Sequence, residues 1–438
     1  MPSLGVSKIP LYAVIRARII YEAFINYPLM LLTMKCRICK SSIVKFLSLG
    51  SMPLANGFLS KSDLKKSENI FPLEACFCQK CKLVQLSYTV DPEIMFKNYV
   101  YVSSTTKTLQ LHFKKMAEEI TREFGLNKKS LVVDIGSNDG VLLKPFKELG
   151  IGAIGVEPAA NVARIAEENG IETINDFFSS NAINRIIERK GHADVITATN
   201  VFAHISDIDD VVKNVKTLLK KHGIFVIEIQ YFMDTIEKMT FDNIYHEHLY
   251  YYTLTSLISF FKRHDMQVFD AKRVDSHGGS LRVFIKRKED RHEIKAQLNE
   301  ILADEKEKGV ESIELYKKFA DNVYSVKEKL VSYIKGIKKQ GKGIAAYGAP
   351  AKGNTLLNFC SIGANYIDYI VEDSPLKIGL YAPGTHIPVV GPETLDEKTP
   401  DYILILAWNF AKEILEKTKK YSEHGVKFII PLPEPRIV

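Results

Sequence analysis

The chain has 438 residues, of which 46% are hydrophobic and 25% are charged. This length and composition exclude collagen-like, low-complexity and wholly disordered chains, and they predict two to four folded domains. The formal net charge of +7 is a modest excess, which suits an anionic small substrate and falls short of a surface that coats nucleic acid.

Residues 1–33 form a first unit whose status the sequence leaves open. The unit is apolar toward its end, but Arg16, Arg18 and Glu22 interrupt it, so it lacks the roughly 20 uncharged residues of a membrane-spanning helix. It could be an amphipathic helix that contacts a membrane or a partner, or a dispensable leader before Met34. We expect the leader, and we expect no membrane partner.

Residues 34–90 carry two CxxC pairs and no long amphipathic pattern. The paired cysteines are Cys36, Cys39, Cys78 and Cys81. Their two-residue spacers let both sulfurs of each pair face one ion, and four thiolates leave no position for water, so we expect a structural Zn²⁺. Cys76 is the alternative ligand, although its place two residues before a CxxC pair suggests a strand side chain. Because six cysteines are too few for a disulfide scaffold in this chain, we expect a reducing, cytoplasmic location.

Residues 91–290 form the next predicted domain, in which apolar strands alternate with helical segments from Ser130 to Ile229, a pattern typical of a parallel doubly wound sheet. The strand that starts at Ser130 ends in the turn Asp-Ile-Gly-Ser-Asn-Asp-Gly (134–140), and a helix follows. A glycine here lets a ligand approach the backbone, and the helix N-terminus favours a carboxylate or phosphate. The next strand ends in Glu157, an acid that could accept two ribose hydroxyls.

Two details favour S-adenosylmethionine (SAM) over a dinucleotide at this turn. The turn is not GxGxxG, and a third strand ends in Asn-Asp-Phe (175–177), where an adenine would lie. A Rossmann fold without a ligand is the remaining alternative. The residues that we expect to contact SAM are Asp134, Gly136, Asn138, Gly140, Glu157, Asp176, Phe177 and Asn200.

A block of His and Tyr side chains interrupts the alternation after residue 240. Tyr245, His246, Glu247 and His248 are consecutive and offer four proton-transfer groups. His248 could act as a base near neutral pH, Glu247 could raise its basicity or fix its tautomer, and Tyr245 could donate to a developing enolate oxygen. The block does not match HExxH, so we expect no catalytic metal. An aromatic loop with surface histidines is the alternative.

His204 follows the fourth strand of the predicted sheet. Open α/β folds bind ligands at the carboxyl edge of their strands, which makes His204 a candidate site residue. Taken alone, a core or capping histidine is the commoner interpretation.

Residues 291–342 are charged and periodic, as in exposed helices that link two domains, and residues 343–438 alternate strands with helices again. This second α/β region opens with a strand, a small-residue turn and a helix that carries Lys352 and Asn354. Such a turn could hold a phosphate or a nucleotide, with Lys352 as the point charge. A plain structural turn is the alternative.

Seven motifs in this order make the chain resemble the SAM-dependent nucleotide-sugar C-methyltransferases. They are CxxC…CxxC, Asp-Ile-Gly-Ser-Asn-Asp-Gly (134–140), Asn-Val-Phe-Ala-His (200–204), Tyr-His-Glu-His (245–248), His-Gly-Gly-Ser-Leu-Arg (277–282), Gly-Ala-Pro-Ala-Lys-Gly-Asn-Thr (348–355) and Pro-Gly-Thr-His-Ile-Pro (383–388). The resemblance covers the chain from about Lys35 onward. It implies an α/β fold with a small zinc-binding module, a central Rossmann-like SAM domain and a C-terminal Rossmann-like domain.

The resemblance also implies roles for individual residues. The family's catalytic base corresponds to His248, and Tyr245, Glu247 and His204 line its pocket. A further pocket tyrosine falls at Tyr99, or else at Tyr101. The substrate implied is a keto-deoxysugar on a nucleoside diphosphate, usually dTDP, held between the last two domains, with Lys352, Asn354 and Tyr101 as expected contacts.

We therefore expect that His248 removes a proton beside a ketone and that the enolate carbon takes the methyl group of SAM. An NAD-dependent sugar-nucleotide oxidoreductase is the first alternative. The second is an RNA-associated zinc protein with a vestigial methyltransferase fold, although the sequence lacks the interleaved basic and aromatic run expected of a nucleic-acid partner. The sequence does not specify the sugar, the carbon or the oligomeric state.

Overall fold

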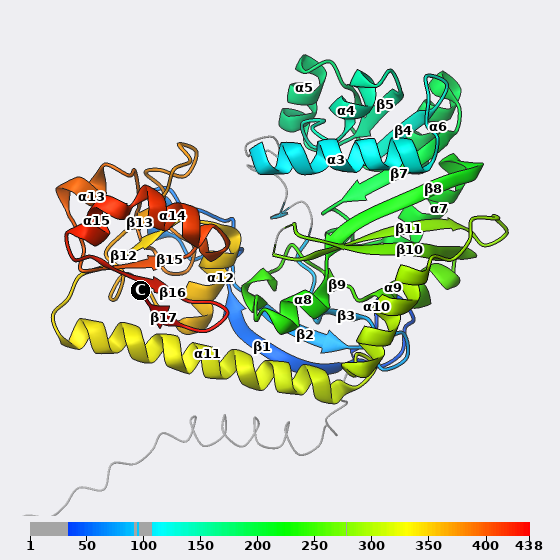
Figure 1. Cartoon of the computed structure of the whole chain (residues 1–438). Helices are drawn as coiled ribbons and strands as arrows, with labels where there is room; N and C mark the ends of the chain where they lie inside the picture. Colours follow the sequence, from blue (N-terminus) through cyan, green and yellow to red (C-terminus); the bar gives the residue numbers. More distant parts are fainter. Residues whose placement is uncertain (1–33, 92–93, 96–106, 277) are drawn as a thin grey trace, which may run out of the picture.

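The computed structural model describes residues 34–91, 94–95, 107–276 and 278–438, and within them the chain forms three sheets with helices around them (Figure 1). The predicted fold class is confirmed: the chain is an α/β protein with a small cysteine-bearing module, a central Rossmann-like domain and a C-terminal Rossmann-like domain. Tyr99 and Tyr101, both predicted pocket residues, lie outside the described residues.

Within the described part of the chain, none of the helices combines the length and the apolar character that crossing a membrane requires.

The N-terminal module is built on a four-stranded antiparallel sheet. Its strands, in spatial order, are β1 (Val44–Met52), β2 (Phe71–Phe77), β3 (Val84–Leu86) and β9 (Tyr250–Tyr251). The short 3₁₀ helix η1 (Asp63–Lys65) lies between β1 and β2. Strand β9 belongs to the His/Tyr block, and it pairs Tyr250 with Gln85 and Tyr251 with Val84. The block is therefore hydrogen-bonded into the N-terminal module.

The central domain has a seven-stranded sheet of order β10-β11-β8-β7-β4-β5-β6. Its strands are β4 (Leu131–Ile135), β5 (Gly152–Val156), β6 (Glu172–Ile174), β7 (Ala193–Thr199), β8 (Leu219–Gln230), β10 (Met266–Val274) and β11 (Ser280–Arg287). Strands β4 to β8 are parallel as predicted, whereas β11 runs antiparallel to both β8 and β10. Strands β10 and β11 lie beyond the alternation that predicted parallel strands, and they form an antiparallel edge because the short loop between them can connect only antiparallel neighbours.

Helices cover both faces of this sheet. They are α3 (Lys107–Glu123), α4 (Leu143–Glu148), α5 (Ala160–Glu168), α6 (Ser180–Lys190), α7 (Ile208–Leu218) and α9 (Leu254–Lys262). The helix α8 (Phe232–Glu237) and the 3₁₀ helix η3 (Phe241–Asn243) follow β8, and they place Phe232 and Phe241 in the core of the N-terminal module. Helix α3 buries Phe113, Met116 and Ile120, which share one helical face. This face packs with Val132 of β4 and Phe146 of α4.

The C-terminal domain has a six-stranded sheet of order β14-β13-β12-β15-β16-β17, which is parallel except for β17. The strands are β12 (Ile344–Tyr347), β13 (Ile370–Val371), β14 (Val389–Val390), β15 (Tyr402–Ile405), β16 (Lys427–Ile430) and β17 (Arg436–Ile437). The helices are α12 (Ala351–Cys360), α13 (Thr394–Glu397), η4 (Trp408–Phe410), α14 (Ala411–Lys417) and α15 (Lys419–Glu423).

Two helices, α10 (Ala296–Glu307) and α11 (Ile313–Lys339), connect the central and C-terminal domains. Helix α11 runs along one side of the molecule, beneath both the N-terminal module and the C-terminal domain (Figure 1). One hydrophobic core contains Phe77 of β2, Tyr316 of α11 and Leu356 of α12. The N-terminal module and the C-terminal domain therefore share a core through α11.

Candidate active site and metal centre

The four predicted cysteine ligands converge on one point. Their sulfur atoms all lie within 4.8 Å of one another, and the Cys36–Cys81 and Cys39–Cys78 sulfur distances are 3.6 and 3.4 Å. A tetrahedral zinc ion with Zn–S bonds of about 2.3 Å separates its sulfurs by roughly 3.8 Å. These distances are far longer than a disulfide bond of about 2.0 Å. The cluster therefore fits Zn²⁺ with four thiolates and no open position.

Gln85 supports this cluster from the neighbouring strand. Its Nε2 donates to Cys36 Sγ at 3.1 Å, and its Oε1 accepts from the Arg37 amide at 2.9 Å. Such outer contacts orient a ligand thiolate. Cys76 does not belong to the sulfur cluster. It is buried on β2, and because its sulfur lies outside the cluster it does not replace a ligand.

The glycine turn after β4 brings three strand ends close together. Gly136 has φ of +65°, and a Cβ at this position would lie 2.6 Å from Val201 Cγ2. Its amide donates to the Val156 carbonyl at 2.8 Å. Gly140 and Asn138 also have positive φ values, of 78° and 50°. The turn therefore needs glycine both for its backbone conformation and for its contact with the loop after β7.

Two buried carboxyl groups lie beside this turn. Glu157 accepts from the amides of Asn138 and Ala159, each at 2.9 Å, and burial raises its pKa. Asp134 accepts from the Thr197 hydroxyl at 2.6 Å, and burial raises the pKa of Asp134 to about 7. The turn thus has an acidic side that could hold hydroxyl groups or a positive charge.

The remaining predicted SAM residues border the same edge of the sheet. Phe177 is 65% exposed after β6, and its amide donates to Asp176 Oδ1 at 2.8 Å. Asn175 ties this loop to the Glu157 carbonyl at 2.8 Å. Asn200 has φ of +55° after β7, and its amide donates to the Glu228 carbonyl at 2.7 Å. All of these residues follow the carboxyl ends of β6 and β7, which belong to the parallel part of the sheet.

The His/Tyr block places His248 against two aromatic partners. His248 Nδ1 lies 2.8 Å from the Asn243 carbonyl, which fixes the proton on Nδ1 of the neutral ring. The ring centroid of Tyr245 lies 4.1 Å away, and that of His204 lies 4.8 Å away at an interplanar angle of 75°. Burial lowers the pKa of His204 to about 3, and the neighbouring His248 acts in the same direction.

The other two members of the block face the N-terminal module. Glu247 Oε1 accepts from Asn56 Nδ2 at 2.7 Å, and His246 Nε2 lies 3.2 Å from the Phe71 carbonyl. We predicted that Glu247 could fix the tautomer of the base, but the Asn243 carbonyl holds Nδ1 instead. Neighbours in an irregular segment point in different directions, so four consecutive groups do not form one cluster. The sequence contained no signal for Asn56 or Asn243.

The loop after β7 connects the glycine turn with His248. Val201 packs on Gly136, and the Val201 carbonyl accepts from the His204 amide at 2.9 Å. The amide of Leu249 donates to the Ala203 carbonyl at 2.8 Å. The glycine turn and the two histidine rings therefore border one short loop.

The turn after β12 repeats the geometry of the turn after β4. Gly348 has φ of +84°, and a Cβ there would lie 2.7 Å from Ala407, which follows β15. Glu372, which follows β13, accepts from the Ala349 amide at 2.8 Å, as Glu157 accepts from Asn138. The C-terminal domain thus has a second glycine turn bordered by an acid, and this turn could hold a nucleotide.

Lysines flank this second turn. Lys352 Nζ donates to Asn409 Oδ1 at 2.6 Å and lies 4.2 Å from the ring centroid of Trp408. Lys377, which sequence reasoning missed, donates to the Ala349 carbonyl at 2.9 Å.

Asn354 is fully buried, and its Nδ2 donates to the Ala55 carbonyl at 2.8 Å. This contact joins α12 to the N-terminal module, so the side chain holds two domains together.

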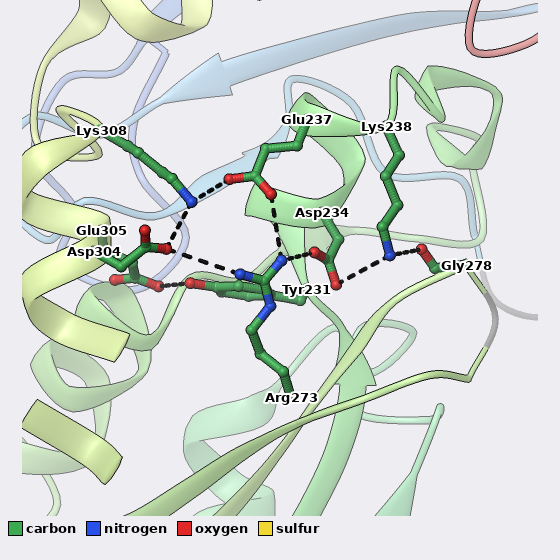
Figure 2. A network of polar contacts seen from close by, with 9 residues as sticks. All are labelled: Tyr231, Asp234, Glu237, Lys238, Arg273, Gly278, Asp304, Glu305 and Lys308. Atoms are coloured by element: carbon green, nitrogen blue, oxygen red, sulfur yellow. Dashed lines mark hydrogen bonds and ion pairs between the residues drawn. The ribbon is translucent and has the colours of Figure 1, made fainter. Parts of the chain in front are cut away.

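The loop that carries the His-Gly-Gly-Ser-Leu-Arg motif contacts helix α8 of the central domain. Figure 2 shows Lys238 donating to the Gly278 carbonyl at 2.9 Å and Arg273 bound to Asp234 of α8. A Cβ on Gly279 would lie 2.1 Å from Asp234 Oδ2. Arg273 also reaches Asp304 of α10, at 3.8 Å. The loop is thereby held against α8, and the preceding strand β10 is tied through Arg273 to the helical linker.

Comparison with known families matches most of the chain to three domains. Residues 36–96 match a zinc binding domain, residues 109–270 a methyltransferase domain, and residues 275–433 a C-methyltransferase C-terminal domain.

The chain is also similar to individual proteins. The C-methyltransferase NovU from Streptomyces niveus is 36% identical over 405 residues, which are 92% of this chain and 96% of that protein. A ubiquinone biosynthesis O-methyltransferase from Rhodopseudomonas palustris (strain TIE-1) is 28% identical over 113 residues, which are 24% of this chain and 45% of that protein. The solved magnesium protoporphyrin IX methyltransferase from Synechocystis PCC 6803 with bound SAM aligns with a TM-score of 0.32 at 10% identity, covering 43% of this chain and 86% of that one.

Proposed function

Because this chain belongs to the SAM-dependent C-methyltransferases that carry a zinc-binding module and a C-terminal domain, we propose that it adds a branching methyl group to a nucleotide-linked keto-deoxysugar. The expected carrier is dTDP, and the general base is His248. One observation carries this proposal: His248 has Nδ1 held by the Asn243 carbonyl at 2.8 Å while the rings of Tyr245 and His204 adjoin it.

The fixed tautomer supports the role of His248 as a base. When Nδ1 carries the proton, Nε2 carries the lone pair that accepts a proton from the substrate carbon. This carbon is acidic only when it lies beside a ketone, because the negative charge left by deprotonation is then delocalised onto the ketone oxygen. General-base catalysis of this kind contributes on the order of 100- to 10,000-fold.

Tyr245 and His204 are the proposed donors to the enolate oxygen. A phenol donates through its hydroxyl group. His204 stays neutral at physiological pH, because burial lowers its pKa to about 3, and a neutral imidazole still donates one N–H. Donors aimed at developing charge are among the largest contributions to catalysis. When bound, SAM supplies the electrophilic methyl group that the enolate carbon accepts.

The glycine turn after β4 is the proposed SAM site. Glu157 would accept the ribose hydroxyls, and Asp176 and Phe177 would adjoin the adenine. The two buried carboxyl groups, Asp134 and Glu157, suit a cofactor with a positively charged sulfonium and an amino group. The thiolates of Cys36, Cys39, Cys78 and Cys81 hold the structural zinc.

The turn after β12 is the proposed site for the nucleoside diphosphate. Lys352 and Lys377 supply positive charge beside the N-terminus of α12, and Glu372 borders the turn as Glu157 borders the first one. Trp408 lies against Lys352, and its indole Nε1 donates to Asp242 at 2.6 Å. The residue after Asp242 is Asn243, whose carbonyl contacts Nδ1 of His248. The nucleotide and the reacting sugar would thus lie on facing sides of one domain boundary.

The test is a product analysis. Purified protein is incubated with SAM and a panel of dTDP-linked 4-keto-6-deoxysugars, and mass spectrometry records the gain of one methyl group on a carbon atom. Without SAM, the same substrates in D₂O should exchange the hydrogen beside the ketone. A chain that neither methylates nor exchanges any panel member would refute the proposal.

Variants assign the base. His248→Asn should lose methyl transfer and exchange by roughly 100- to 10,000-fold while SAM still binds. His192→Asn, at an exposed histidine, serves as the matched control and should behave as wild type. Hydrogen exchange at the wild-type rate in His248→Asn would show that His248 is not the general base.

A further inference from the structure

The turn η3 (Phe241–Asn243), whose last residue contacts the proposed base His248, is anchored to the C-terminal domain at two adjacent residues. Phe241 packs on Phe359 of α12, with ring centroids 5.6 Å apart. Asp242 is fully buried, and its Oδ2 accepts from the indole Nε1 of Trp408 at 2.6 Å. One apolar and one polar contact therefore cross the domain boundary at this turn.

Opposite charges hold the indole ring in place. Lys352 Nζ lies 4.2 Å from the ring centroid of Trp408, on the face of the ring, while the Asp242 carboxyl group accepts from its edge. Burial raises the pKa of Asp242 to about 6, and the charge of Lys352 opposes this rise. Trp408 and Lys352 thus keep the buried Asp242 carboxyl group hydrogen-bonded and close to a cation, which restricts the conformations open to the turn η3.

The carbonyl that orients the base belongs to the next residue. Asn243 follows Asp242 directly, and its carbonyl is 2.8 Å from Nδ1 of His248. The Ile244 amide donates to the Phe241 carbonyl at 2.9 Å, and this hydrogen bond closes the turn around Asp242 and Asn243. A displacement of Asp242 would therefore displace the carbonyl that sets the tautomer and position of His248.

We propose that Trp408 and Asp242 are positioning residues, through which the C-terminal domain holds the Asn243 carbonyl against His248. This inference rests on the proposed function, since it concerns the same base. It assigns the C-terminal domain a part in proton abstraction in addition to substrate binding.

The first experiment separates positioning from folding. Asp242→Leu removes the acceptor of the indole N–H, whereas Asp242→Asn keeps a carbonyl acceptor of the same shape. Trp408→Phe removes the donor and keeps an aromatic ring. We expect Asp242→Leu and Trp408→Phe to lower kcat and the SAM-independent hydrogen exchange of the substrate by the same factor, roughly 10- to 100-fold. Asp242→Asn should recover most of both rates.

Three measurements keep the result interpretable. The SAM dissociation constant should stay within about twofold of wild type in every variant, because the glycine turn of the central domain is untouched. The chain has a single tryptophan, so the fluorescence of Asp242→Leu reports Trp408 alone and should differ from wild type. Phe410→Ala, an exposed residue of the same short helix, is the control and should leave both rates unchanged.

The outcomes are distinct. Wild-type exchange and kcat in both Asp242→Leu and Trp408→Phe would overturn the positioning role. A parallel loss of SAM affinity in these variants would show general disruption and would also overturn it. If the wild-type protein exchanges no panel substrate, the proposed function itself fails, and the inference fails with it.

Discussion

Asn56 and Glu247 are 191 residues apart in the chain, and they share a hydrogen bond of 2.7 Å. Asn56 belongs to the zinc-binding module, while Glu247 directly precedes the proposed base. The contact lies beside the pairing of β3 with β9 and beside the contact of His246 with Phe71. The zinc-binding module is therefore part of the support for His248, in addition to being a folding unit.

We expect Asn56→Ala to lower kcat roughly 10-fold while SAM affinity stays unchanged. Removing the amide leaves the Glu247 carboxyl group, whose pKa burial already raises, without this donor, and the adjacent base loses its fixed position. Steady-state kinetics and calorimetric SAM titration measure the two effects. Asn69→Ala, at an exposed asparagine of the same module, is the control. Wild-type kcat in Asn56→Ala would show that this contact does not support catalysis.

Removal of a zinc ligand should unfold the module and abolish activity together. We expect one zinc ion per chain by elemental analysis, and we expect Cys39→Ser to lose the metal and to melt at a lower temperature. The metal contributes folding free energy, because the four cysteine sulfurs lie close enough together to bind one ion only when the module is folded. Cys76→Ala should retain the zinc, since Cys76 lies outside the sulfur cluster. Metal loss in Cys76→Ala with retention in Cys39→Ser would reverse the assignment.

Glu157→Gln should weaken SAM binding by roughly 10- to 100-fold, the range expected when charged hydrogen bonds are lost. Both carboxylate oxygens accept backbone amides, so the change also loosens the glycine turn. Isothermal titration without sugar substrate measures the effect directly. The control is Glu167→Gln, an exposed position on α5. An unchanged dissociation constant would contradict the proposed ribose contact.

The fold could be predicted because its signals are local. The strand and turn patterns around Gly136 and Gly348 follow from short apolar runs and glycine positions, and two CxxC pairs are specific for a metal cluster. The family resemblance, the SAM cofactor and the structural zinc predicted from these motifs are confirmed by the family matches and the 36% identical relative.

The candidate site was harder to predict, because side-chain direction and domain contacts are not local properties. His246 and Glu247 are adjacent to His248 in sequence, yet they contact the N-terminal module. Several motif residues join domains: Asn354 reaches Ala55, and the Gly384 amide donates to Glu68 at 3.0 Å. A sequence motif marks a residue whose identity matters, but the structure decides whether that residue contacts a ligand or a neighbouring domain.

The neutral state of His204 predicts how acid affects stability. Its folded-state pKa is about 3, whereas an unfolded histidine titrates near 6.5. Between these values the unfolded chain binds a proton that the folded chain does not, so stability falls as the pH decreases through this window and is unaffected above it. We expect the melting temperature of the wild-type protein to fall more steeply from pH 7 to pH 5 than that of His204→Gln, as measured by calorimetry without SAM. His192→Gln, at an exposed histidine, should follow the wild-type curve. Parallel curves for wild type and His204→Gln would show that His204 is not held neutral, and its proposed role as a neutral donor to the enolate oxygen would then lose its physical basis.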